Sequence, residues 1–259
     1  MRISLIIIIT TLLFPVEGLK MVSSKKVDCT NFTTDNLGNV YLIKGNTIEK
    51  YLPNGTLQNQ YSSKIYGEIN FVDTRNPLQI LLFYPDITKI VFLDNTLSVH
   101  HDISLEQYQL EQVNLVCSSV NNSIWVYDQS SLQLIRFNQQ INKIQETGNI
   151  IQLLGVEINP NYLLESNNHI YLNDPEIGIF VFDIFGTYLK TIPIKGLSSF
   201  QVTETHIHYI QQGDVYSFDF KTLESNKITL PFLDIDQFRI EKNSIYTLKQ
   251  QTLAKYIID

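Results

Sequence analysis

The sequence predicts an all-β protein, a six-bladed β-propeller of four-stranded antiparallel blades that is closed by an N-terminal strand completing the last blade. Three observations lead to this fold class. Apolar anchor residues recur with a period of about forty residues, and turn-forming residues separate short β-rich segments. The last repeat also stops one strand short, while an unassigned segment remains near the start of the chain.

Each repeat contains three bulky anchors in a fixed order. The first opens the unit, the second follows eight to ten residues later, and the third comes ten to twelve residues after that. The first anchors are Phe32, Phe71, Leu115, Tyr162, Phe200 and Phe238; the second are Tyr41, Leu81, Trp125, Tyr171, His208 and Tyr246; the third are Tyr51, Phe92, Phe137, Phe182, Phe218 and Tyr256. Six units therefore stay in register along the chain.

The segments between the anchors have the composition of strands. Residues 179–182 and 215–218 are rich in β-branched and aromatic side chains, and turn residues such as Gly213-Asp214 lie between such runs. Each unit continues into a more polar fourth segment, for example Tyr188 to Ile194, as expected of a solvent-facing outer strand. Four strands repeated six times predict a propeller, because blades packed face to face around an axis bury their apolar faces.

The sixth unit ends at Asp259, directly after its third strand. Residues 19–27 precede the first unit and are the natural candidate for the missing outer strand of blade six. The predicted blades span residues 28–66, 67–109, 110–153, 154–196, 197–233, and 234–259 together with 19–27. An open solenoid would need polar capping units, and two sandwiches would need a linker in mid-chain. Neither feature is present in the sequence.

Residues 1–18 are predicted to be a secretory signal peptide. Met1-Arg2 is a short basic start, Ile3 to Phe14 is almost entirely apolar, and small residues stand at Val16 and Gly18. We expect cleavage after Gly18, which leaves residues 19–259 as a single propeller domain in the periplasm or outside the cell. An uncleaved anchor is the alternative, although the apolar run is short for a membrane span. No later segment resembles a membrane helix.

Charge and cysteine content narrow the range of partners. The formal net charge of −7 argues against nucleic acid as a ligand. Cys29 and Cys117 fall at the first strands of non-adjacent blades, beyond the usual reach of a disulfide, so we expect two buried thiols. The spacing of Cys and His matches no metal site, and no cofactor is expected.

No local motif for nucleophilic, phosphate-binding or metalloprotease chemistry occurs in the chain. Glu165, Glu204 and Glu241 end or follow first strands, where they could form an acidic funnel on the axis; exposed strand ends are the alternative interpretation. Asp94, Asp183 and Asp219 follow third anchors, in a position that suits turn residues as well as cation ligands.

One loop is predicted to dock a partner. It lies between the first two strands of the second unit and combines charge with a rigid proline: Asp73, Arg75, Asn76 and Pro77. Such loops decorate one face of a propeller and carry binding residues more often than the strands do.

The first unit resembles the NHL and YVTN repeats of the propeller superfamily, in residues 35–41 (DNLGNVY) and in Pro53-Asn54-Gly55. The segment Val72 to Ser98, together with the signal peptide, is similar to small exported propeller-like proteins of Bacteroidota. This second resemblance implies a periplasmic protein associated with outer-membrane secretion machinery, and it supplies no catalytic residues.

These observations predict a non-catalytic periplasmic propeller that acts as a protein-interaction module and is a monomer on its own. The alternative is an enzyme or a small-ligand binder that uses the axial funnel.

Overall fold

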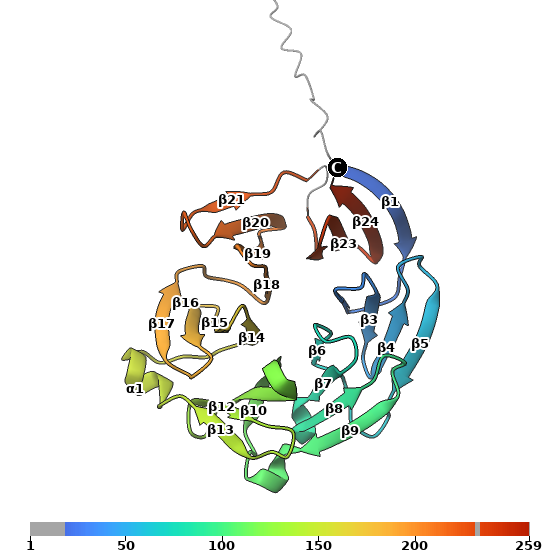
Figure 1. Ribbon diagram of the computed structural model, residues 1–259. Helices are drawn as coiled ribbons and strands as arrows, with labels where there is room; N and C mark the ends of the chain where they lie inside the picture. The colour runs from blue at the N-terminus through green and yellow to red at the C-terminus, as the bar shows by residue number, and fades with distance from the viewer. Residues whose placement is uncertain (1–18, 231–233, 259) are drawn as a thin grey trace, which may run out of the picture.

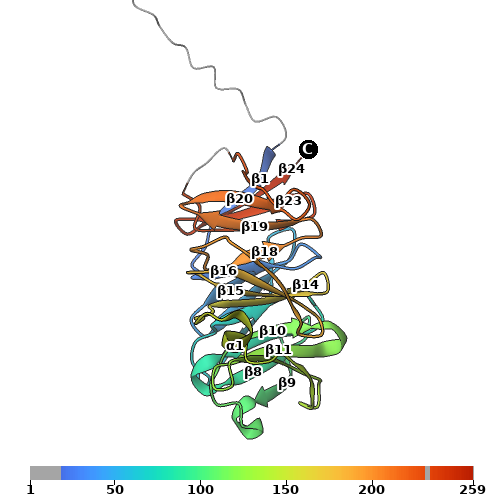
Figure 2. The same cartoon turned by 90° about the vertical axis from the view of Figure 1, so that its left-hand side faces the viewer.

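The computed structural model describes residues 19–230 and 234–258. Six four-stranded antiparallel sheets surround a central axis, as Figure 1 shows in a view along that axis. Seen from the side, the same sheets form a disc (Figure 2). In each sheet the strands follow chain order from the axis outward, except in the last, where the order is β22, β23, β24 and then β1.

The blades are made of the following strands. Blade 1 contains β2 (Asn31–Thr34), β3 (Val40–Lys44), β4 (Thr47–Tyr51) and β5 (Leu57–Ser62); blade 2 contains β6 (Phe71–Asp73), β7 (Ile80–Tyr84), β8 (Lys89–Leu93) and β9 (Val99–Ser104); blade 3 contains β10 (Val113–Ser119), β11 (Ser123–Asp128), β12 (Gln133–Phe137) and β13 (Lys143–Glu146). Blade 4 contains β14 (Tyr162–Ser166), β15 (His169–Asp174), β16 (Gly178–Asp183) and β17 (Tyr188–Ile192); blade 5 contains β18 (Phe200–Val202), β19 (His206–Gln211), β20 (Asp214–Asp219) and β21 (Ser225–Lys227); blade 6 contains β22 (Gln237–Glu241), β23 (Ser244–Lys249), β24 (Thr252–Ile258) and β1 (Leu19–Lys26).

The predicted six-bladed fold is confirmed, and all eighteen anchors lie on the first three strands of their blades. The core consists of layers between neighbouring blades rather than one central nucleus. Trp125 of blade 3, for example, packs in one cluster with Leu172 and Phe180 of blade 4. Middle strands such as β7 and β11 are buried along their whole length, because both of their faces contact another blade.

The predicted closure is also confirmed. Strand β1 pairs antiparallel with β24 from Leu19 opposite Ile258 to Lys26 opposite Thr252, with one irregularity between Met21 and Ser23. Figure 1 shows this blue strand lying beside the dark red one. The side chains of β1 are almost all exposed, so backbone hydrogen bonds rather than apolar burial hold it in place.

Two further features bear on the sequence predictions. A short helix, α1 (Ile150–Leu154), lies between blades 3 and 4, where the sequence shows no helical period; the Asn149 side chain caps it by accepting a hydrogen bond from the Gln152 backbone N–H. Cys29 and Cys117 are both buried free thiols, and burial raises the pKa of Cys117 to about 12.

The predicted signal peptide, residues 1–18, lies outside the described residues. None of the helices that the structure describes is long and apolar enough to cross a membrane.

Removing residues 19–26 should lower the melting temperature by about 10 °C or more, because the loss of β1 exposes the paired edge of β24 and opens the ring. Thermal unfolding followed by circular dichroism measures this. The double variant Lys20→Ala/Lys26→Ala keeps the backbone of β1 and should stay within a few degrees of the parent. Equal melting temperatures for the parent and the deletion would show that β1 does not close the ring.

Candidate functional site along the propeller axis

The first strand of each blade is the terminal strand of its sheet, so one of its edges has no neighbouring strand. Backbone N–H and C=O groups on such an edge need other partners when they are buried. In this propeller, side chains of an adjacent blade supply some of them and also bind polar groups beside the first strands. We call these contacts the inter-blade clasps.

A clasp occurs at every junction between consecutive blades, and each junction uses different residues. Between blades 1 and 2, Thr74 donates to the Thr34 carbonyl; between blades 2 and 3, Asp73 and Arg75 bind Ser118; and between blades 3 and 4, Glu165 binds Ser119, Val120 and Trp125.

The other three junctions use amide side chains. Between blades 4 and 5, Asn161 and Asn173 donate to the Leu197 carbonyl; between blades 5 and 6, Gln201 binds both backbone groups of Ile240; and between blades 6 and 1, Gln237 binds Phe32 and Thr30.

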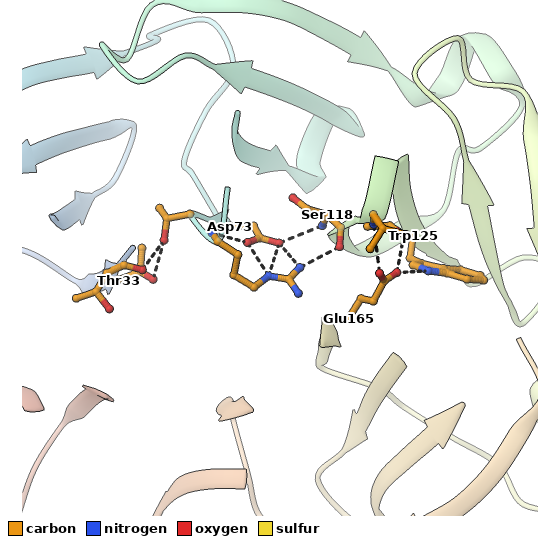
Figure 3. A network of polar contacts seen from close by, with 10 residues as sticks. Thr33, Asp73, Ser118, Trp125 and Glu165 are labelled. Atoms are coloured by element: carbon orange, nitrogen blue, oxygen red, sulfur yellow. Dashed lines mark hydrogen bonds and ion pairs between the residues drawn. The ribbon is translucent and has the colours of Figure 1, made fainter. Parts of the chain in front are cut away.

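The clasp between blades 2 and 3 involves two residues of the predicted docking loop. The side chain of Asp73 is only 2% exposed and pairs with the Arg75 guanidinium. Its Oδ2 accepts the Ser118 backbone N–H at 3.0 Å, while Arg75 Nη2 donates to the Ser118 carbonyl at 2.9 Å (Figure 3). Burial alone would raise the pKa of Asp73, but the Arg75 charge and these hydrogen bonds outweigh it and hold the pKa below its usual value.

Glu165 fills the next junction instead of facing an open funnel. It is 5% exposed and accepts hydrogen bonds from Trp125 Nε1 at 2.7 Å, from the Val120 N–H at 3.2 Å and from the Ser119 hydroxyl. Figure 3 shows this carboxylate directed at the indole of blade 3. Its oxygens are thus occupied by a structural contact.

The other sequence-predicted residues are spread over the same end of the molecule. Glu204 lies on the exposed turn before β19, whereas Glu241 lines a cavity on the axis, so the three glutamates do not converge. In the docking loop, Asn76 accepts the Leu78 backbone N–H at 3.1 Å and thereby fixes the turn, while Pro77 is half-buried.

Two cavities lie along the axis, one above the other. They share Phe71, Tyr162 and Phe200, which we call the aromatic waist. The rings of Phe71 and Tyr162 are 6.1 Å apart between centroids, and those of Tyr162 and Phe200 are 5.1 Å apart, both edge to face. Arg239 of β22 also lines both cavities.

The smaller cavity, of about 200 Å³, lies at the carboxyl ends of the first strands; we call it the charged cavity. Asp35, Asp73, Arg75, Arg239 and Glu241 line it. Asp35 is saturated, since it accepts from two backbone N–H groups, an amide and a tyrosine hydroxyl. Burial raises the pKa of Glu241, opposed by its hydrogen bond from Thr34 and by the Arg239 charge.

The larger cavity, of about 440 Å³, lies at the amino ends of the first strands; we call it the amide cavity. Its wall carries side chains that the sequence interpretation missed, although they repeat. A small polar residue directly precedes the first anchor in every blade: Asn31, Asn70, Asn114, Asn161, Ser199 and Gln237. This position could have been found by extending the repeat one residue upstream of each anchor.

Other candidate ligands serve local structure. Asp94, Asp183 and Asp219 each accept backbone N–H groups of their own turns. His206 pairs with Asp219, whereas His208 is a packed ring whose Nδ1 is buried without a partner among the described residues. In those same residues, no group of three or more His, Cys, Asp or Glu side chains could hold a metal ion.

Comparison with known proteins identifies the fold alone. No family model matches the sequence, and no curated protein matches it. Virginiamycin B lyase from Staphylococcus aureus superimposes with a TM-score of 0.62 at 11% identity, covering 93% of this chain and 100% of that one. The Pan2 WD40 domain of Neurospora crassa gives 0.58 at 7% identity, over 95% and 97% of the two chains. The extracellular domain of BT4673 from B. thetaiotaomicron gives 0.57 at 12% identity, over 86% of this chain and 32% of that chain.

The substitution Glu165→Gln should destabilise the protein by about 1–3 kcal/mol, because an amide NH₂ would face donors that need an acceptor. Trp125 is the only tryptophan, so its fluorescence reports this junction directly. We expect a changed emission maximum and a lower denaturant midpoint. The matched change Glu204→Gln, on an exposed turn, should leave both unchanged. An unperturbed Glu165→Gln variant would mean that the clasp contributes nothing.

His208 should make the protein sensitive to mild acid. Burial, followed by the charge of His206, lowers the pKa of His208 to about 4, against about 6.5 in the unfolded chain. Between these values only the unfolded state binds the proton, so stability falls as the pH drops from 6.5 to 4, by roughly 2–3 kcal/mol. His208→Phe should flatten this part of the stability profile in urea unfolding at pH 7 and pH 5, whereas His169→Gln should keep the parent slope. A parent-like slope in His208→Phe would contradict the assignment.

Proposed function

We propose that this protein is an exported, non-catalytic propeller that binds a protein partner through one face of its disc. That face is formed by the loops that join first to second strands and third to fourth strands, and we call it the turn face. It contains the predicted docking loop and the mouth of the charged cavity. The propeller is a monomer on its own and acts as an interaction module.

A set of exposed apolar side chains on the turn face carries this proposal. Five blades in succession, blades 1 to 5, each place one large apolar residue there. These residues are Leu37, Leu78, Val120, Phe185 and Leu223, with exposed fractions of 62%, 70%, 47%, 66% and 61%. Exposed large apolar side chains on the loops of one face make that face a candidate interaction surface.

Hydrogen bonds fix the backbone that carries these side chains. The N–H of Leu37 binds Asp35, that of Leu78 binds Asn76, and that of Val120 binds Glu165. The N–H groups of Phe185 and Leu223 bind the side chain of Asp183 and the carbonyl of Asp219 in the same way. A surface held rigid before binding loses little conformational entropy on association, which favours a docking role.

The partner proposed here is a different protein with apolar and basic side chains on its contact surface. A net charge of −7 opposes the face-to-face association of two copies of this chain and favours a partner of opposite charge. We further propose that residues 1–18 direct export to the periplasm or beyond, and that the partner belongs to the cell envelope, with the outer-membrane secretion machinery as the first candidate. The layout of the leader and the resemblance to exported propellers support this location.

Photo-crosslinking in the producing cell tests the partner face. A crosslinking residue placed at Leu78 should yield an adduct with one protein of different mass, and Leu37→Asp in the same chain should abolish that adduct. The control position is Ile65, which is 80% exposed but lies in the connection between blades 1 and 2 at the opposite end of the disc. Mass spectrometry of the same preparation should show a chain that begins at Leu19. An adduct formed equally from Ile65, or one with the mass of two copies, would refute the proposed partner face.

A further inference from the structure

We propose that the amide cavity, at the opposite end of the axis from the turn face, binds a carboxylate-bearing sugar of about monosaccharide size. This site would be separate from the partner face. The size of the cavity, the chemistry of its wall, a guanidinium without an ion pair among the described residues and the aromatic waist at its floor support this site.

The cavity is large enough and reachable from solvent. Its volume of about 440 Å³ falls in the range of about 300–1,000 Å³ that is typical of small-molecule sites. Asn31, Asn70, Asn161 and Ser199 on its rim are exposed, so a ligand can enter at the amino ends of the first strands.

The wall presents amides that are free to bind hydroxyl groups. Asn31, Asn70 and Asn114 line the cavity from three consecutive blades, and none of their side chains makes a hydrogen bond in the part of the chain that the structure describes. Asn114 Oδ1 is buried without a partner among the described residues, and a buried acceptor without a hydrogen bond costs free energy. A carboxamide offers both donors and acceptors, and this combination matches the hydroxyl groups of a sugar.

Arg239 places a cation at the floor of the cavity, whereas the acidic lining residue, Asp236, is exposed and accepts the Gln250 backbone N–H. Arg239 is half-buried and contacts the Tyr162 hydroxyl of the waist but, unlike Arg75, forms no ion pair among the residues described. Its charge reaches Glu241, but that carboxylate is held by Thr34 on the far side of the waist. The guanidinium fork suits a carboxylate better than any other common ligand group apart from phosphate.

The waist adds an apolar surface beside this cation. Phe71, Tyr162 and Phe200 cross the axis as edge-to-face rings, against which the C–H face of a sugar ring can pack. Burial raises the pKa of Tyr162, so its hydroxyl stays protonated at neutral pH. A neutral sugar would use the amides and the rings but give the Arg239 charge no counter-ion, and for this reason we infer an acidic one.

Calorimetric titration of the purified protein tests the proposal with three probes: glucuronate, glucose, and a short peptide with a free C-terminal carboxylate. We expect glucuronate to bind about 10-fold or more tightly than glucose, since a charge-assisted pair separates them. Arg239→Gln should weaken glucuronate binding by about 10- to 100-fold and leave glucose unchanged. Asn70→Ala should weaken both sugars together.

The control for charge is Lys190→Gln, which removes one cation from the exposed outer strand β17 and should bind like the parent. Circular dichroism and thermal unfolding establish that each variant is folded. Equal affinity for the two sugars, tighter binding of the peptide, no binding of any probe, or a folded Arg239→Gln variant with parental affinity would each overturn the proposal. A negative result would leave the turn-face crosslink unaffected, because the two sites share only the waist and the residues around it.

Discussion

The unpaired edge of each first strand is the constraint on which the rest of this propeller depends. Six strands converge on the axis with backbone groups that no neighbouring strand can reach. Apolar packing between blades brings these edges together but cannot satisfy them. The clasps satisfy such groups in β2, β10 and β22, and each clasp joins two consecutive blades, so together they also set how one blade sits against the next. Gln237 and Gln201 show this most simply, because each binds a backbone N–H and a C=O across a junction with one side chain.

This constraint also decides which polar groups are left for function. Glu165, Asp73 and Asp35 are charged and near the axis, yet their oxygens are taken up by structural hydrogen bonds. What remains is a smaller set: the free amides of the larger cavity and the guanidinium of Arg239. The axial polar side chains therefore fall into two groups: those whose hydrogen bonds hold the blades together, and those that can still bind a ligand. Sorting them by charge alone would select the wrong residues.

The sequence therefore predicts the fold well and the site poorly, for a physical reason. Packing between blades follows the same arrangement around the ring, so bulky anchors recur at the same positions, and His208 is recognisable as a ring where four of the other five second anchors are aromatic. The clasps use different residue types at different junctions, and only Asn161 and Gln237 among them stand at a recurring position, so no single repeat reveals the whole set. Glu165 and Glu241 look alike as strand-end glutamates, but only Glu241 reaches a cavity. The residue before each first anchor does recur, and it marks the amide cavity.

One strand, β22, carries residues that line both axial cavities. Along β22, Gln237 clasps blade 1, Arg239 lies at the waist and Glu241 lines the charged cavity; being two residues apart, they share one face of the strand. β22 belongs to the blade that β1 completes, so the strand that carries all three groups is held in the ring by the chain's own first described strand. Closure is therefore more than a device for stability, because it fixes the position of the guanidinium relative to the amides of blades 1 to 3. A propeller with a loose sixth blade would keep its anchors and lose the geometry of its axis.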